Sequence, residues 1–217
     1  GEGGQDGPAY NFSWNCGVEG PSRKKKIQEL RLQQMKNAFL LLLFSQGTPM
    51  ILAGDEFGNS QRGNNNPYCQ DNETSWLEWN GLKKQAELFE FVKAAIAFRK
   101  THPLLHQAKE LQGTSGSVLG YPDVSCHGQQ AWYGNFETIS RHFGMMYCGE
   151  EGEYLYVAYN LHWKEQSFAL PKLPEGLSWQ LVFDTEDGAS PEKEIKWIDQ
   201  KSFEAPPRSI LVLEGRK

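Results

Sequence analysis

Residues 38–54 read AFLLLLFSQGTPMILAG, and this stretch decides the expected fold. Its first part, Ala38 to Phe44, is apolar on every side and ends a predicted helix that begins near Ser22, a plausible N-cap. The end of this helix should therefore be enclosed on all faces. The run from Thr48 to Gly54 is short, apolar and bounded by proline and glycine, which is typical of a strand buried on both faces of a parallel sheet. A helix followed by a buried strand is half of a βαβ unit.

A long polar segment from Gly54 to Gly81 follows this predicted strand. In α/β folds, loops at the carboxyl ends of strands hold the ligand contacts. Amides and carboxylates can hydrogen-bond hydroxyl groups, and aromatic rings can pack on sugar faces, so the mixture suits a neutral polyol such as a glucan. The alternative explains the composition equally well: Asn and Asp form turns, Trp76 and Trp79 anchor the core, and Asp55 and Glu56 are solvated.

The second half of the chain has a different periodicity. A second helix is predicted from Leu82 to Phe98 and ends before Pro103. After about residue 104 the period changes to two, and strands such as residues 167–170 alternate polar and apolar residues, as antiparallel strands with one wet face do. The strands are expected at 154–160, 166–170, 179–184, 194–198 and 209–214. The predicted fold class is α/β plus all-β, with an α/β part over residues 1–103 and an antiparallel β-sandwich over residues 104–217.

Composition excludes several classes of function. The 22 Lys and Arg against 27 Asp and Glu give a net charge of −5, which argues against a nucleic-acid partner, and no apolar run is long enough for a membrane span. The four cysteines show no zinc-site spacing, and no GxGxxG or Walker A pattern occurs, so neither a metal nor a cofactor is expected. The scattered histidines suggest no catalytic triad. Adjacent Asp55 and Glu56 would point in different directions and make a poor pair for glycoside hydrolysis.

Three long segments carry a specific resemblance: Ser13 to Pro21, Ser45 to Gly58 and Gly63 to Glu73. They resemble isoamylase-type glycogen debranching enzymes of the α-amylase superfamily, glycoside hydrolase family 13. The resemblance continues through Ala131 to Tyr133 and Leu155 to Trp163, and so covers nearly the whole chain.

This resemblance implies a (β/α)₈ TIM barrel followed by a C-terminal β-sandwich, in an enzyme that hydrolyses α-1,6 branch points. Residues 1–103 would be the end of the barrel, comprising loop 7, helix 7, strand 8, loop 8 and helix 8, and residues 104–217 the sandwich. The catalytic carboxylates would lie upstream of Gly1, so the chain is interpreted as a fragment that is inactive alone. One departure is Ser125-Cys126-His127, where relatives usually have tryptophan before the histidine.

The resemblance also implies substrate contacts, because Asn66 and Asn72 match positions that hold glucose units in related amylases. The candidate substrate-binding residues are Trp14, Asn15, Arg62, Asn65, Asn66, Tyr68, Asp71 and Asn72, with no catalytic residue. The expected partners are a branched α-glucan and the remainder of the barrel, in the cytoplasm. Cys16 and Cys69 are expected close together but reduced. The alternative is a non-catalytic β-sandwich module that binds carbohydrate or stabilises the barrel.

Overall fold

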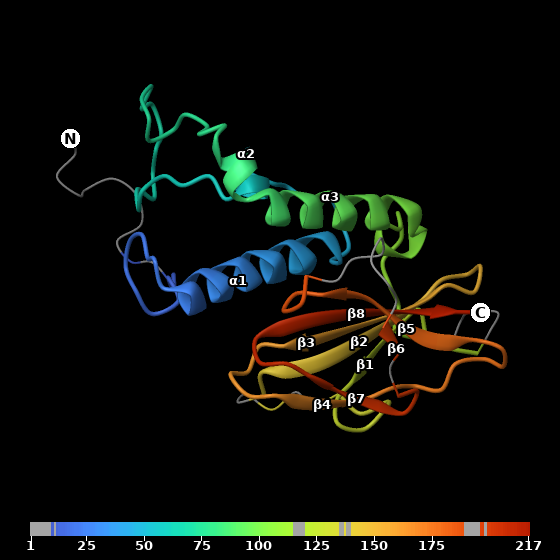
Figure 1. Cartoon of the computed structure of the whole chain (residues 1–217). Coiled ribbons are helices and arrows are strands. Elements are labelled where there is room, and N and C mark those ends of the chain that lie inside the picture. The colour runs from blue at the N-terminus through green and yellow to red at the C-terminus, as the bar shows by residue number, and fades with distance from the viewer. Residues whose placement is uncertain are drawn as a thin grey trace.

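The structure is a computed structural model that describes residue 10 and residues 12–114, 120–134, 137, 140–188, 196–197 and 199–217. It has three layers (Figure 1): two long helices cover one face of a six-stranded antiparallel sheet, and a two-stranded sheet covers the other face. The coarse prediction of a β-sandwich is confirmed, because two antiparallel sheets enclose a common apolar core.

The helical elements precede all of the strands in the chain. They are α1 (Lys25–Leu43), the short 3₁₀ helix η1 (Asp55–Phe57), α2 (Gly81–Lys84), α3 (Ala86–Thr101) and η2 (Pro103–Leu105). The strands are β1 (Val124–His127), β2 (His142–Cys148), β3 (Tyr154–Asn160), β4 (Gln166–Ala169), β5 (Ser178–Asp184), β6 (Lys196–Trp197), β7 (Ser202–Ala205) and β8 (Ser209–Arg216).

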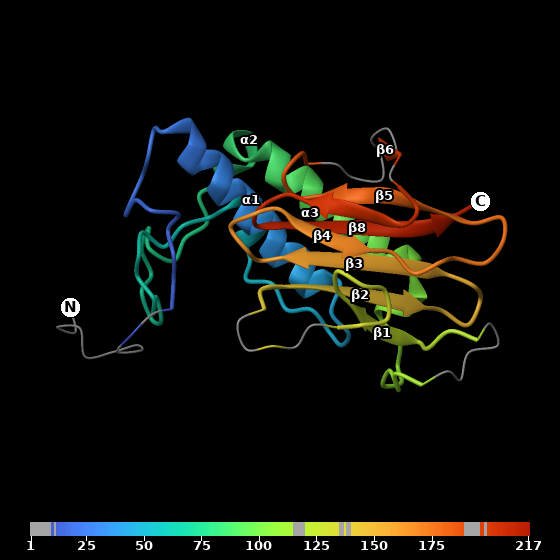
Figure 2. The same cartoon turned by 90° about the horizontal axis from the view of Figure 1, so that it is seen from below.

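The large sheet has the order β1-β2-β3-β8-β5-β6, and the small sheet pairs β4 with β7. Figure 2 shows β1 and β6 at the two edges, with α1 and α3 crossing behind the sheet. In the centre, β3 pairs with β8, and Val157 lies opposite Val212. All described strand pairs are antiparallel.

The central strand β3 is buried on both faces, because both sets of its alternating side chains are apolar. Leu155, Val157 and Tyr159 belong to the core beneath the helices, whereas Tyr154 and Tyr156 belong to the core against β4 and β7. The alternation of polar and apolar residues expected for strands such as residues 167–170 therefore does not extend to the centre of the large sheet.

A cluster of phenylalanines joins the helices to the sheet. Phe183 of β5 makes edge-on contacts with Phe44, Phe91 and Phe98, at centroid distances of 5.8, 5.6 and 5.4 Å. Each of these rings is at most 4% exposed. Edge-to-face packing at this distance stabilises the contact beyond simple burial. The helices and the sheet thus share one apolar core.

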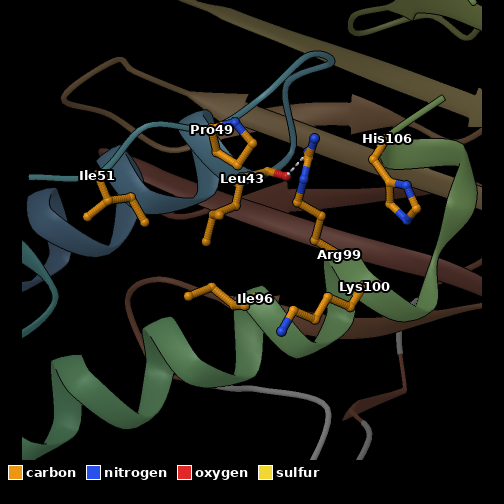
Figure 3. A pocket seen from close by; sticks show the side chains of 7 residues that line it. All are labelled: Leu43, Pro49, Ile51, Ile96, Arg99, Lys100 and His106. Carbon is orange, nitrogen blue, oxygen red and sulfur yellow. Dashed lines mark hydrogen bonds between the residues drawn. The ribbon is translucent and has the colours of Figure 1, made fainter. Parts of the chain in front are cut away.

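Arg99 holds the C-terminal end of α1 (Figure 3). Its guanidinium donates hydrogen bonds to the carbonyl oxygens of Leu43, Ser45 and Gly47, at 2.5, 2.8 and 2.6 Å. Figure 3 draws the bond to Leu43. These oxygens lie at and just beyond the helix end, where α-helical partners are missing. Beside Arg99 a mainly apolar cavity of about 370 Å³ lies between α1, residues 49–51 and α3.

The strand expected at residues 48–53 does not form in the described structure. A parallel strand needs neighbours to pair its backbone groups, and no described strand lies beside this segment. The enclosure expected on all faces is only partial among the described residues, because Leu40, Leu43 and Phe44 are buried but other apolar side chains of this region are not. Met50 is 88% exposed, Leu52 is 61% exposed and Leu41, near the end of α1, is 38% exposed.

Other predictions were confirmed or corrected in detail. β3 has the expected limits, and β4, β5 and β8 match within two residues. Only Lys196 and Trp197 of the strand expected at 194–198 are described, and they form β6. Helix α1 begins at Lys25 with Lys24 as its N-cap, so the Ser22 cap was wrong; Ser22 Oγ instead accepts a hydrogen bond from Lys24 N. Strands β1, β2 and β7 were not predicted.

Candidate glucan-binding loop

The polar loop begins at a glycine whose conformation requires that residue. Gly54 has φ +100°, and a Cβ there would lie 2.7 Å from Asn59 Cβ and 2.8 Å from Leu77 Cδ2. Its N–H donates a 2.8 Å hydrogen bond to Glu56 Oε2, and its carbonyl accepts from the amides of Phe57 and Asn59. Glu56 therefore serves to fold the start of the loop.

The two ends of the loop are joined at its base. Phe57 of η1 is 1% exposed and lies against Trp79, with ring centroids 5.7 Å apart. Asn59 Oδ1 accepts a 2.9 Å hydrogen bond from the amide of Glu78. One apolar contact and one hydrogen bond thus close a loop of more than twenty residues, which limits its freedom at the base.

Asparagine side chains fold the outer part of the loop. The Oδ1 atoms of Asn64, Asn66 and Asn72 accept hydrogen bonds from the amides of Asn66, Tyr68 and Thr74, at 2.8, 3.4 and 2.9 Å. Each is an Asx turn, in which a side chain stabilises the backbone two residues further on. The turn-forming role considered for these asparagines is therefore confirmed. These turns use the side-chain carbonyl oxygens of the three asparagines. A role of their side-chain amide groups in binding sugar remains a proposal.

Two side-chain pairs add to this bracing. Arg62 pairs with Glu73 through two contacts of 3.1 Å, although both side chains are about two-thirds exposed. Such an exposed pair contributes about 0–1 kcal/mol. Trp76 Nε1 donates a 2.8 Å hydrogen bond to Asp71 Oδ1. Asn65 also has a partner within the structure.

Exposed aromatic rings distinguish this loop from an ordinary surface turn. Tyr68 is 76% exposed, Trp79 64% and Trp76 59%. Trp76 and Trp79 therefore do not act mainly as buried core anchors, although Trp79 contacts Phe57. Large exposed aromatic side chains on a braced loop can stack on the apolar faces of sugar rings.

Two cavities lie along the loop, a mainly polar one and a larger one with a mixed lining. The smaller, of about 350 Å³, is lined by residues that include Asp55, Asn59, Gln61 and Asn64. The larger is a groove of about 1070 Å³ between α1, residues 14–22 and residues 50–60, and Trp14, Asn15, Asp55 and Asn59 all line it. Neither lining includes Arg62, Asn65, Asn66, Tyr68, Asp71 or Asn72. The structure brings Trp14 and Asn15 to the groove, and the other six predicted residues to the outer loop.

The segment that carries Trp14 is held from two sides. Arg31 of α1 donates hydrogen bonds to the carbonyl oxygens of Asn15 and Val18, at 3.1 and 2.5 Å. From the turn before β8, the Arg208 guanidinium lies 5.2 Å from the centre of the Trp14 ring, in a cation–π contact. Trp14 remains 55% exposed, so its ring is positioned but accessible.

Asp55 is the acidic residue of the smaller cavity. Burial, together with the neighbouring Glu56, raises the pKa of its carboxyl group. No second carboxylate appears in the lining of that cavity, whereas glycoside hydrolysis uses a facing pair. Among the described residues no cluster of metal-binding side chains was found. In that same part of the chain, no helix has both the length and the apolar character needed to span a bilayer.

Ser125 and His127 form a close pair that sequence inspection did not single out as a site. Ser125 Oγ lies 2.8 Å from His127 Nε2, and the amide of Trp132 donates to His127 Nδ1 at 2.8 Å. Since Nδ1 accepts a hydrogen bond, the neutral ring carries its proton on Nε2 and donates it to Ser125. His127 cannot then act as a base toward Ser125. The buried histidine, whose pKa burial lowers to about 4, has a structural role.

Comparison with known proteins agrees with the resemblance seen in the sequence. The family described as Isoamylase 1-3, C-terminal, matches residues 125–195, which begin in β1 and extend to just before β6. The "Glycogen operon protein GlgX homolog" of Mycobacterium tuberculosis is 34% identical over 230 residues, covering 98% of this chain and 32% of that protein.

The chain is similar to isoamylase-type debranching enzymes over part of their length. A "Glycogen debranching enzyme" of Pectobacterium carotovorum is 48% identical over 118 residues, which cover 54% of this chain and 18% of that protein. Among solved structures, a pullulanase from Bacillus acidopullulyticus superposes with a TM-score of 0.65 at 17% identity, over 89% of this chain and 21% of that one. The chain spans about a third or less of the length of these relatives.

Several residues of the site were missed by sequence reasoning. Asn59 and Gln61 line the cavities, and Arg208, more than 190 residues after Trp14, reaches its ring. Asn59 follows the glycine-rich start of the loop, so its position in the sequence could have identified it as a candidate residue. The sequence near Arg208 gives no such signal, because its contact with Trp14 exists only in the folded chain.

Proposed function

We propose that this chain is part of a glycoside hydrolase that debranches glycogen- or starch-type α-glucans at α-1,6 linkages. In this proposal it supplies substrate-lining loops and a C-terminal β-sandwich, and the catalytic carboxylates come from elsewhere in the enzyme. The observation that carries the proposal is the braced loop at 54–81, which exposes Tyr68 and Trp76 and whose first residues, among them Asp55 and Asn59, line the larger groove. Relatives named as debranching enzymes supply the reaction class.

The helical part would complete a barrel with the remainder of the enzyme. Residues 1–103 would then be the end of a (β/α)₈ barrel, with residues 48–53 as its last strand, and residues 104–217 the sandwich. The support is the apolar surface that this segment leaves exposed, Met50 and Leu52 above all. Neighbouring strands would cover these side chains and pair the backbone of residues 48–53.

The substrate contacts would come from two places on one face. Trp14 and Asn15 line the groove beside α1, and the outer loop offers Arg62, Asn65, Asn66, Tyr68, Asp71 and Asn72. Rings of Trp14 and Tyr68 would stack on glucose, and the amides of Asn66 and Asn72 would donate to hydroxyl groups. The branched α-glucan would be the substrate. The four thiols, none of them in a disulfide, favour work in the cytoplasm.

The experiment is affinity electrophoresis of the 217-residue chain in gels with and without glycogen. We expect glycogen to retard the chain, and the paired variant Tyr68→Ala/Asn72→Ala to lose most of this retardation. The matched control is Trp163→Ala. Trp163 is 50% exposed, but its ring already packs against His162 and Arg141, at 4.2 and 4.9 Å. Equal retardation of the paired variant and the unmodified chain would contradict the proposed site.

A further inference from the structure

The turn between β1 and β2 presents an exposed tryptophan in an unusual backbone conformation. Trp132 has φ +70°, in the left-handed region that favours glycine. Such a conformation is unfavourable for a non-glycine residue and persists only where its surroundings enforce it. The ring is nevertheless 46% exposed, and that of the next residue, Tyr133, is 72% exposed.

Buried groups hold Trp132 in place. Its amide donates to Nδ1 of His127, which is fully buried, and its ring meets that imidazole edge-on at 5.0 Å. On another side the ring stacks on Tyr121, with centroids 6.0 Å apart and an angle of 29°. Tyr121 is itself fixed, because its hydroxyl donates to the carbonyl of Lys172 at 3.0 Å. The exposed ring is therefore prearranged.

Hydrogen bonds also anchor residues 128–133 of the turn. The carbonyl of Gly128 accepts a 3.0 Å hydrogen bond from Ala169 of β4, and the carbonyl of Gln130 accepts from Tyr133. Gln129 and Gln130, in the same turn, are also exposed. One rigid surface thus combines aromatic faces with amide donors and acceptors, and it carries no formal charge between residues 128 and 134.

We propose that this surface, formed by Tyr121, Gln130, Trp132 and Tyr133, is an accessory binding site for a linear segment of α-glucan. Aromatic faces stack on the apolar faces of glucose units, and amides hydrogen-bond their hydroxyl groups. A neutral surface of this kind suits a neutral polysaccharide. The choice of an α-glucan as the ligand rests on the proposed function. The residues of the accessory site, however, are not among those proposed to contact substrate.

The accessory site lies far from the loop at 54–81 in the fold. Tyr121 packs against the core on the β4–β7 side of the large sheet, whereas α1 and α3 cover the opposite side (Figure 1). A long glucan could engage both places, and a short oligosaccharide only one at a time. Two linked weak contacts strengthen binding of a polymer more than binding of a short ligand.

The decisive variant is Trp132→Gly in the 217-residue chain. Glycine adopts a positive φ without strain, so the variant removes the ring and relieves the backbone together. We expect a melting temperature within a few degrees of the unmodified chain, and binding to glycogen weakened about five- to tenfold in affinity electrophoresis. Tyr133→Ala, at a more exposed position, should weaken binding in the same direction without a structural effect.

The controls separate this inference from the proposed function. Trp163→Ala should leave binding unchanged, and Tyr68→Ala/Asn72→Ala tests the loop independently. If Trp132→Gly and Tyr133→Ala bind glycogen as the unmodified chain does, the accessory site is wrong, even where the loop variant loses binding. If both weaken binding while the loop variant does not, the accessory site stands and the proposed loop site fails.

Discussion

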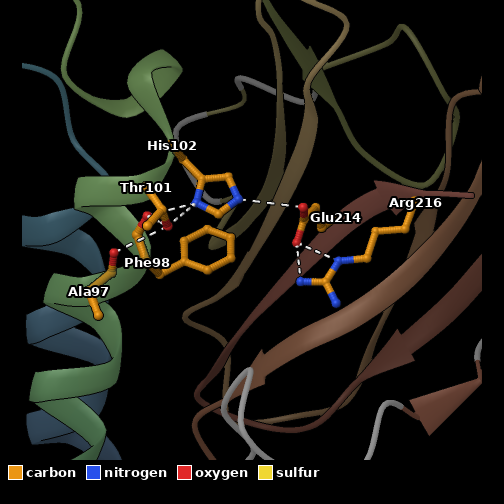
Figure 4. Close-up of polar contacts among 6 residues, drawn as sticks. All are labelled: Ala97, Phe98, Thr101, His102, Glu214 and Arg216. Carbon is orange, nitrogen blue, oxygen red and sulfur yellow. Dashed lines mark hydrogen bonds and ion pairs between the residues drawn. The ribbon is translucent and has the colours of Figure 1, made fainter.

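His102 Nε2 lies 3.4 Å from Glu214 Oε1, so the end of α3 is joined to the last strand of the sheet (Figure 4). The other ring nitrogen of His102 lies 2.7 Å from the carbonyl oxygen of Phe98, and the imidazole stacks on the Phe98 ring at 3.7 Å. Arg216 Nη2 lies 2.6 Å from the second oxygen of Glu214. Both His102 and Glu214 are mostly buried, with side chains 13% and 18% exposed.

This contact shifts the pKa of each partner. Burial alone would lower the pKa of His102, but hydrogen bonds to Glu214 and Phe98 and the charges of Glu214 and Glu153 raise it. Burial alone would raise the pKa of Glu214, but hydrogen bonds from His102 and Arg216 lower it. The stabilisation by Glu214 is present above about pH 4.5 and is lost as the pH falls through its lowered pKa. The stabilisation by His102 is present below about pH 6.5 and is lost as the pH rises through its raised pKa.

The first prediction is that His102→Gln lowers the free energy of unfolding by about 1 kcal/mol at pH 5.5 and by less at pH 9. The reason is that the unmodified chain gains from charged His102 only at the lower pH. Urea unfolding at both pH values measures this. His106→Gln, at an exposed histidine, is the control and should show no such dependence. An equal loss of unfolding free energy at both pH values would contradict the role given to charged His102.

The second prediction concerns the phenylalanine cluster between the helices and the sheet. Phe183→Ala should destabilise the chain by about 3–5 kcal/mol and expose α1 and α3 to protease, because Phe183 contacts Phe44, Phe91 and Phe98. Phe168→Ala is the matched variant on the other face of the sheet, where the ring is also fully buried. It should destabilise to a similar extent without selective cleavage of the helices. Identical cleavage patterns in the two variants would show that the helices do not depend on Phe183.

Much of the sheet could be predicted because its signal is local. β3 and β8 are runs of β-branched, aromatic and aliphatic residues, and such runs indicate buried strands without knowledge of their partners. β2 was missed since Gly144 interrupts its apolar pattern. The structure gives the reason for this glycine: a Cβ there would lie 2.0 Å from the Tyr156 hydroxyl. That close approach depends on pairing with β3, which the sequence near Gly144 does not reveal.

The residue types of the candidate site could be predicted from the sequence, but their arrangement in space was less predictable. The polarity of the loop and its aromatic residues were evident, and the turn-forming role of Asn66 and Asn72 follows from local rules. Residues 48–53 do not form the predicted strand in the described structure, because a buried strand also needs neighbours, and no described strand lies beside them. The strained conformation of Trp132 depends on buried His127, and local propensity gives no sign of it.

The third prediction follows from the apolar side chains at 50–52. Met50 is 88% exposed and Leu52 is 61% exposed, and the groove beside them is lined partly by Leu42 and Ile51. Because exposed apolar surface promotes association, the purified chain should self-associate as its concentration rises. Met50→Glu/Leu52→Glu should shift the mass measured by light scattering toward the monomer. Leu161→Glu, at a leucine 44% exposed elsewhere, is the control. A monomeric unmodified chain whose residues 22–100 resist protease would show that this surface needs no cover.

The fourth prediction is that the chain alone releases no reducing ends from branched or linear α-glucans. Asp55 is the acidic residue of the smaller cavity, and a single carboxylate cannot act as both acid and nucleophile. Loss of catalytic groups lowers rates by many orders of magnitude. A sensitive reducing-end assay of purified chain tests this. Glucan-dependent release that Asp55→Asn abolishes would contradict it.

The most direct test of the central claim is hydrogen–deuterium exchange of the 217-residue chain with and without maltoheptaose. The claim is that the loop at 54–81 binds glucan, and its Asx turns place the amides of Asn66, Tyr68 and Thr74 in that surface. The account predicts slower exchange in peptides from residues 59–76 when the oligosaccharide is present, and unchanged exchange in β3 and β8. Exchange across residues 59–76 that saturating maltoheptaose leaves unchanged would contradict it.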